Sequence, residues 1–158
     1  MFDDEYGNKL STNSSEAVDL YNKGTHQFLG AEPGVEDSFR SAIEADPEFA
    51  LAHIGYAREM QLRGRSTDMR QALKRAIKYP GNLSEREQSH LKVSSLLLSG
   101  KSAEARLAVY EHVRHWPRDV LIAQMCTSVF GLIGFSCLLG REAEQLSFIS
   151  NIGTHAGI

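Results

Sequence analysis

Cysteine and proline are both scarce in this chain of 158 residues, which holds two cysteines and four prolines. Two cysteines are too few for the disulfide framework that stabilises many small secreted domains. Cys126 and Cys137 would lie about 16 Å apart on one continuous helix, which is beyond the reach of a disulfide. We therefore expect reduced thiols and a cytoplasmic protein. The shortage of proline also favours helices, because proline interrupts their hydrogen bonding.

The chain also lacks an excess of positive charge. It carries 17 Lys and Arg residues against 20 Asp and Glu residues, which gives a net charge of −3. Nucleic-acid binding usually needs a strongly basic face, so we expect no nucleic-acid partner. The first nine residues, MFDDEYGNK, are acidic and lack the apolar run of a signal peptide.

One long run without charge, residues 120–140, lies between Asp119 and Arg141 and is long enough to span a membrane. Polar residues such as Gln124 and Ser128 interrupt this run, and glycines are concentrated in its second half. The pattern favours a buried helix of a soluble protein over a membrane span. We therefore expect no membrane partner.

Apolar residues spaced at i, i+3 and i+4 predict that most of the chain is helical. Residues 1–12 are expected to be a poorly ordered lead-in, and a helical domain is expected to fill residues 13–158. Capping residues, prolines and glycines predict helices that begin near residues 13, 33, 47, 66, 84, 102 and 117, with a short eighth helix at 141–149.

Three helix starts carry a specific signal. Asn13 with Glu16, and Ser84 with Glu87, both have the spacing of a capping box. At a third start, Asp46 is expected to cap the following helix and Pro47 to open it, since the first helical N–H needs no partner. This junction joins two helices whose apolar residues both have helical spacing.

A spacing of 34 residues relates these helices to one another. Val35, Phe39 and Ala42 are followed 34 residues later by Met69, Leu73 and Ala76. Pairs of helices with this period are typical of tetratricopeptide repeats, which stack because no single pair can bury its apolar face. We predict an all-α, tetratricopeptide-like stack (an α-solenoid) of about seven or eight helices. Its expected core residues are Leu20, Phe39, Ala42, Ile54, Leu73, Ala76, Val109 and Leu121.

Four separated motifs add a family resemblance. They are LSTNSSEAVDLYN (10–22), AIEADPEFALAH (42–53), LSEREQSHLKV (83–93) and HWPRDVLIA (115–123). Together they resemble the tetratricopeptide repeat protein 38 family from about Leu10 to Gly134. Trp116 departs from the family, which often has histidine there, and family members continue with further helix pairs beyond Ile158. The resemblance implies the fold and an N-terminal portion or short member, and it brings no catalytic residues.

The sequence shows no complete catalytic or metal-binding motif. His112 and His115 are neighbours on one helix, but Arg114 beside them disfavours a cation. His53 and His90 lie within the family motifs, which indicates a structural role. Residues 131–134 lack the lysine and spacing of a phosphate loop. We therefore expect no enzyme, no cofactor and no metal.

The first helices of such stacks line a concave face, which makes that face the candidate binding site. Asn22, Lys23, Arg58 and Lys92 occupy similar levels of these helices, where they could hold the carboxylate of a peptide through charge-assisted hydrogen bonds. We predict a scaffold that binds a protein or peptide. Two alternatives stay open: self-association through the apolar C-terminal helix at 120–139, and an accessory domain of an enzyme.

Overall fold

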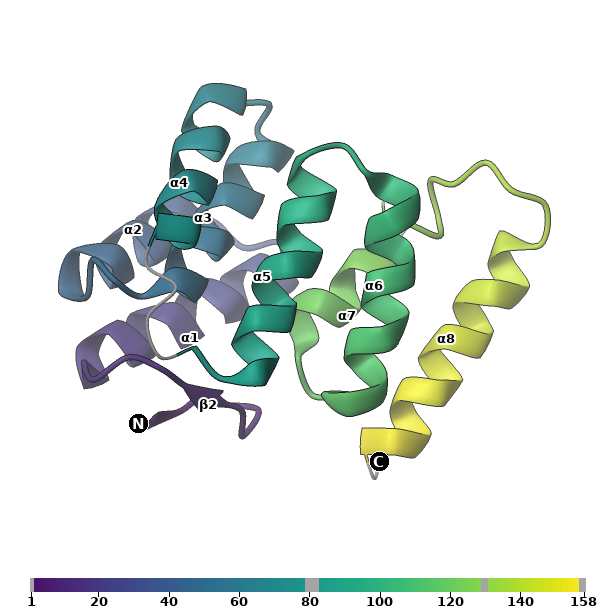
Figure 1. The fold of residues 1–158 in the computed structure, drawn as a ribbon, viewed down its shortest axis with the longest axis horizontal. Coiled ribbons are helices and arrows are strands. Elements are labelled where there is room, and N and C mark those ends of the chain that lie inside the picture. Colours follow the sequence, from purple (N-terminus) through teal and green to yellow (C-terminus); the bar gives the residue numbers. More distant parts are fainter. Residues whose placement is uncertain (1, 79–82, 129–130, 157–158) are drawn as a thin grey trace.

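Eight α-helices follow a short β-hairpin in the computed structural model, which describes residues 2–78, 83–128 and 131–156 (Figure 1). The strands are β1 (Phe2–Asp3) and β2 (Lys9–Leu10), which pair antiparallel. The helices are α1 (Ser15–Leu29), α2 (Val35–Ala45), α3 (Ala50–Leu62), α4 (Ser66–Lys78), α5 (Glu85–Leu98), α6 (Ser102–His115), α7 (Val120–Thr127) and α8 (Arg141–Ala156). The prediction of an all-helical domain is confirmed at this level.

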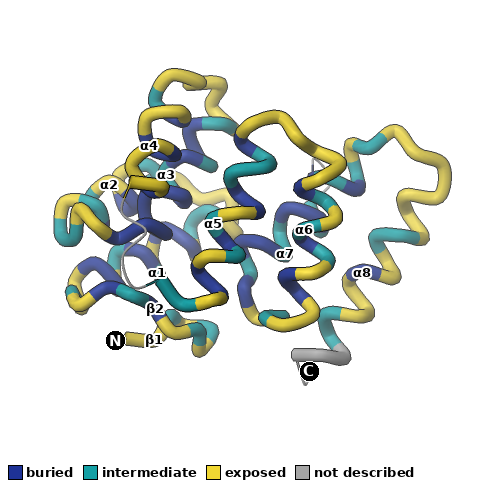
Figure 2. The backbone as a smooth tube through the Cα atoms, in the orientation of Figure 1, coloured by how far each residue is buried: buried dark blue, intermediate teal, exposed yellow. Residues whose placement is uncertain are grey.

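The helices pack in consecutive pairs. Helix α1 packs against α2, α3 against α4, and α5 against α6, while the contacts between α7 and α8 are sparser. The odd-numbered helices also contact one another, α1 with α3, α3 with α5, and α5 with α7. Because α1 also touches α7, these four helices enclose a common interior. Figure 2 shows the buried backbone gathered where the helices face each other and the exposed backbone on turns and outer faces.

Helix α7 is shorter than the uncharged run that contains it. The expected apolar helix at 120–139 is wrong, because α7 ends at Thr127 and the chain then folds back on it. The amide of Leu132 donates to the Met125 carbonyl over 2.7 Å, and a β-carbon at Gly131 would lie 2.5 Å from that oxygen. Within the described residues, no helix has both the length and the apolar character needed to cross a membrane.

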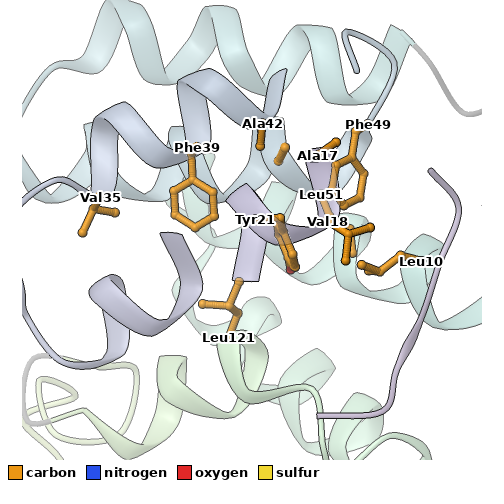
Figure 3. Close-up of a cluster of buried hydrophobic side chains, with 11 residues drawn as sticks. Leu10, Ala17, Val18, Tyr21, Val35, Phe39, Ala42, Phe49, Leu51 and Leu121 are labelled. Carbon is orange, nitrogen blue, oxygen red and sulfur yellow. The ribbon is translucent and has the colours of Figure 1, made fainter. Parts of the chain in front are cut away.

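The predicted core residues are buried, with one exception. Leu20 is only partly buried, whereas Phe39, Ala42, Ile54, Leu73, Ala76, Val109 and Leu121 are all buried. Figure 3 shows Phe39 of α2 close to Tyr21 of α1 and Leu121 of α7; the rings of Phe39 and Tyr21 are 5.9 Å apart. On α4, by contrast, the side chain of Ile77 is exposed.

Two of the three predicted helix starts need correction. Ser14, not Asn13, caps α1, and its hydroxyl accepts from the amide of Ala17 over 3.1 Å. Helix α3 begins at Ala50, so Asp46 does not cap it. Asp46 instead accepts hydrogen bonds from the Thr12 hydroxyl and from the Glu48 amide, which form a turn before the helix. The third prediction is confirmed, since Ser84 and Glu87 form a complete capping box.

The N-terminal segment is folded, contrary to the expected poorly ordered lead-in. Leu10 is completely buried. The amide of Ser11 donates to Glu87 over 2.8 Å, and the Asn8 side chain donates to the carbonyl of Arg118 over 3.0 Å. These bonds fix the segment to α5 and to the turn before α7.

Candidate functional site

A cluster of four buried polar side chains joins α5, α6 and the start of α7. Arg86 and His90 lie one turn apart on α5, so both project from the same face. His112 comes from the last turn of α6, and Asp119 is the N-cap residue of α7. All four are buried. The two helix ends thus bring a carboxylate and an imidazole against the side of α5.

Side-chain nitrogens of Arg86, His90 and His112 all lie close to the same oxygen of Asp119. Oδ2 lies 2.6 Å from Nη1 of Arg86 and 2.9 Å from Nδ1 of His90. Nε2 of His112 lies 3.2 Å from the same oxygen, off the line of a standard hydrogen bond, and its Nδ1 is 2.8 Å from the Ser89 hydroxyl. Arg86 also donates to the carbonyl of Lys9 over 2.9 Å, which ties the N-terminal segment into the cluster.

Burial and neighbouring charges shift the pKa values of three groups in this cluster. Burial raises the pKa of Asp119, but its neighbours His90, His112 and Arg86 together lower it by more. The pKa of Asp119 therefore lies well below its usual value. Burial lowers the pKa of Arg86, and Asp119 more than offsets this. Burial also lowers the pKa of His112, which keeps that ring neutral near pH 7. The cluster therefore pairs the Asp119 carboxylate with the Arg86 guanidinium, beside the neutral ring of His112.

The pairing of His90 with Asp119 resembles the arrangement that orients a histidine as a general base. His90 lines a cavity together with Phe28, Phe39, Leu121 and other side chains, and its Nε2 has no hydrogen-bond partner within the described residues. The cavity volume is about 10 Å³, which is room for about one water molecule. A space of that size admits no substrate, so the cluster is best interpreted as a joint between helices.

Arg58 of α3 lines the same cavity. Its Nη1 donates to Gln61, and its Nε is buried without a partner within the described residues. Arg58 and Met125 also line a larger groove of about 400 Å³, so they separate the inner cavity from it. The groove is further lined by Gln61, Leu62, Leu97, Ser102, Gly131, Leu132, Phe135 and Ser136.

The other three predicted binding residues have different surroundings. Asn22 is half-buried, and its side chain accepts from the amide of Glu5 over 3.3 Å. Lys23 and Lys92 are exposed. Arg58, by contrast, is half-buried and faces the interior between the odd-numbered helices. Arg58 is therefore the predicted residue that lines both the inner cavity and the groove.

Two histidines of the family motifs are buried, as a structural role requires. His53 has its Nε2 2.8 Å from the carbonyl of Pro47, and burial lowers its pKa. Sequence reasoning missed the partners of His90. The spacing of Arg86 and His90 on one helical face was a usable signal, but nothing local in the sequence places Asp119 against them.

The cysteines and metal-type ligands add no site. Cys126 is buried, and burial raises the pKa of its thiol to about 12, while Cys137 is exposed. Both are free thiols. In the part of the chain that the structure describes, no group of three or more His, Cys, Asp or Glu side chains could hold a metal ion.

No protein-family model matches the chain, and neither a curated protein nor a solved structure shows significant similarity to it. The resemblance to the tetratricopeptide repeat protein 38 family therefore stays a prediction from the four sequence motifs.

Proposed function

We propose that the chain is a tetratricopeptide-like stack of four helix pairs that binds a protein or peptide partner in the cytoplasm. The consecutive pairing of the helices supports this proposal. So does the 34-residue spacing, since Phe39 of α2 and Leu73 of α4 are both buried at equivalent positions. We also propose membership of the tetratricopeptide repeat protein 38 family on the four motifs alone.

The observation that carries the proposal is a group of exposed apolar side chains at residues 135–149, which we propose to act as an apolar surface. Five large apolar side chains of this segment are exposed: Phe135, Leu138, Leu139, Leu146 and Ile149. Leu139 is fully exposed, at 104%. Exposed apolar side chains scattered singly need no explanation, but several within one short segment are typical of an interaction surface.

A groove of about 660 Å³ borders this segment between α6 and α8. Leu107 and Tyr110 line it, and the hydroxyl of Tyr110 donates to Glu144 over 2.7 Å. Arg106 also donates to Glu144, so that an ion pair fixes α8 to α6 beside the groove. The fixed groove and the neighbouring apolar side chains offer a partner both shape and apolar area.

A peptide library selected against the chain tests this function. Peptides selected on the unaltered protein are expected to lose at least tenfold in affinity for the double variant Leu146→Ser and Ile149→Ser, because two apolar contacts are lost. Ile77→Ser is the matched control, since Ile77 is an exposed apolar residue on α4. Equal binding by the double variant and the control, or no selected peptide, would contradict the proposal.

Self-association is a second candidate, and the same exposed side chains favour it. The candidate surface for self-association differs from the apolar helix expected at 120–139, because Leu121, Ile122 and Met125 of α7 are buried. Light scattering separates the two candidates. A scaffold for other proteins is expected near the monomer mass of 17.5 kDa, whereas a self-association module is expected at twice that mass and as a monomer after Leu146→Ser and Ile149→Ser.

A further inference from the structure

Arg58 differs in its partners from the other basic side chains that are buried or half-buried. Within the described residues, Arg58, Arg86 and Arg106 are the Lys and Arg residues that are not exposed. Arg86 is paired with Asp119, and Arg106 is paired with Glu144. Among the residues that the structure describes, Arg58 has only the neutral side chain of Gln61 as a hydrogen-bond partner.

An unpaired, half-buried guanidinium is unfavourable on physical grounds. Removing a charge from water costs several kcal/mol unless an opposite charge and hydrogen bonds compensate it. Burial accordingly lowers the pKa of Arg58 from its usual value, with no acidic neighbour opposing that effect. A charge held at this cost suggests that an anion from outside the chain completes the site.

The geometry decides on which side of Arg58 such an anion would lie. The inner cavity, where Nε2 of His90 also lacks a partner, has room for about one water molecule and is too small for an organic ligand. The outer groove has a volume of about 400 Å³, which lies within the range of small-molecule sites. The ligand therefore belongs in the outer groove.

The lining of the groove specifies the chemistry of the ligand. Its apolar side chains are Leu62, Leu97, Met125, Leu132 and Phe135, and no acidic residue is among its described lining residues. Gln61, Ser102 and Ser136 add neutral polar groups. One cation at an apolar groove matches a molecule with one negative charge and an apolar chain.

We propose that this groove binds a small monocarboxylic acid, with its carboxylate on Arg58 and its apolar chain against Leu97 and Phe135. Guanidinium and carboxylate form strong, directional pairs when both are withdrawn from water. A divalent head group such as a phosphate would be left with uncompensated charge. The site shares Phe135 with the apolar surface at residues 135–149, but its cation, Arg58, lies outside that surface.

Octanoate and its neutral counterpart 1-octanol are the probes for this site, titrated calorimetrically below their aggregation concentrations at pH 7.5. Octanoate is expected to bind the unaltered chain at least tenfold more tightly than octanol, because the alcohol cannot pair with Arg58. Arg58→Met is expected to abolish that difference, whereas Lys92→Met, which removes an exposed cation of α5, is expected to preserve it.

A second measurement distinguishes a ligand site from a structural arginine. Without ligand, Arg58→Met is expected to raise the melting temperature, since it replaces a half-buried guanidinium that lacks a counter-charge by an apolar side chain. A lower melting temperature, or equal binding of octanoate and octanol by the unaltered chain, would overturn the proposal. The comparison of the two probes needs no variant, so it decides the question even where a variant folds poorly. Leu146→Ser and Ile149→Ser are expected to leave octanoate binding unchanged, which separates this site from the partner surface.

Discussion

The ring of Phe39 lies so close to Gly55 that a β-carbon on this glycine would be 2.5 Å from Cε1 of the ring. Gly24 of α1 faces the same ring, where a β-carbon would be 3.0 Å from it. Phe39 itself is completely buried. The two glycines therefore allow α1, α2 and α3 to approach one aromatic side chain.

Gly55→Ala is expected to destabilise the protein by about 1–3 kcal/mol, because the added methyl group displaces a buried ring in a packed core. Urea unfolding followed by circular dichroism measures this loss. Gly153→Ala is the control, since a β-carbon at this helical glycine of α8 meets no atom within 4 Å. That variant is expected to be neutral or slightly stabilising, and an equal loss in both variants would show that close packing at Gly55 is not the cause.

Phe39→Ala is expected to cost about 3–5 kcal/mol, because it removes a fully buried aromatic side chain and leaves a cavity. Urea unfolding gives the free energy directly. Leu107→Ala removes an exposed apolar side chain of α6 and is expected to change stability little. A loss at Phe39 of less than a third of the expected value would mean that the α1–α2–α3 contact contributes little to folding.

Asp119→Asn is expected to cost about 3–5 kcal/mol, because it leaves Arg86 buried without its counter-charge. Asp37→Asn is the matched control, since Asp37 pairs with Arg40 on the exposed side of α2, where an ion pair contributes about 0–1 kcal/mol. Thermal and urea unfolding of both variants test the difference. Similar losses in the two would argue against the buried cluster as a joint between helices.

Stability is expected to fall as the pH drops below about 6.5, the usual pKa of histidine. Burial lowers the pKa values of His53 and His112 in the folded chain, so below pH 6.5 the unfolded chain binds protons that the folded chain does not. The lowered pKa of Asp119 acts in the same direction at more acid pH, below about 3.9. Urea midpoints measured from pH 7.5 to 5 are expected to fall less for the double variant His53→Gln and His112→Gln. If the double variant had the same slope of urea midpoint against pH as the unaltered chain, the burial of neutral His53 and His112 rings would be contradicted. His26→Gln, at an exposed site on α1, controls for the loss of a histidine.

Ser14→Ala is expected to cost about 0.5–2 kcal/mol, the usual loss when a helix N-cap is removed. Asn13→Ala is expected to be close to neutral, because the hydroxyl of Ser14 already accepts from the Ala17 amide. The two adjacent substitutions, compared by thermal unfolding, identify the cap. A larger effect at Asn13 would reverse the assignment.

Local sequence signals predicted most of the helices. The range of α6, Ser102–His115, follows from Gly100 before it and Pro117 after it. The capping box at Ser84 and Glu87 predicted the start of α5 correctly, because both of its hydrogen bonds are local. The 34-residue spacing also placed Phe39 and Leu73 correctly in the core.

The errors arise where distant residues decide the local structure. Asp46 accepts from the Thr12 hydroxyl, 34 residues away, as well as from the nearby Glu48 amide, and it does not cap α3. The fold-back after α7 is a different case: the glycines of this run were a local signal for it, but the contact of Gly131 with the Met125 carbonyl could not be read from the sequence. Arg58 was predicted as part of a solvent-facing set with Lys92, but the contacts among odd-numbered helices turn it towards the interior.

The hydrogen bonds of the N-terminal segment also bear on how the chain loses its structure. In a linear array each unit touches only its neighbours, so one end can open while the other stays folded. Here Asn8 is bonded to Arg118, and Ser11 to Glu87. Opening the α5–α7 region therefore releases the start of the chain, and opening the start exposes Glu87 and Arg86. We therefore expect the two halves of the molecule to unfold together as one cooperative unit, and not from either end.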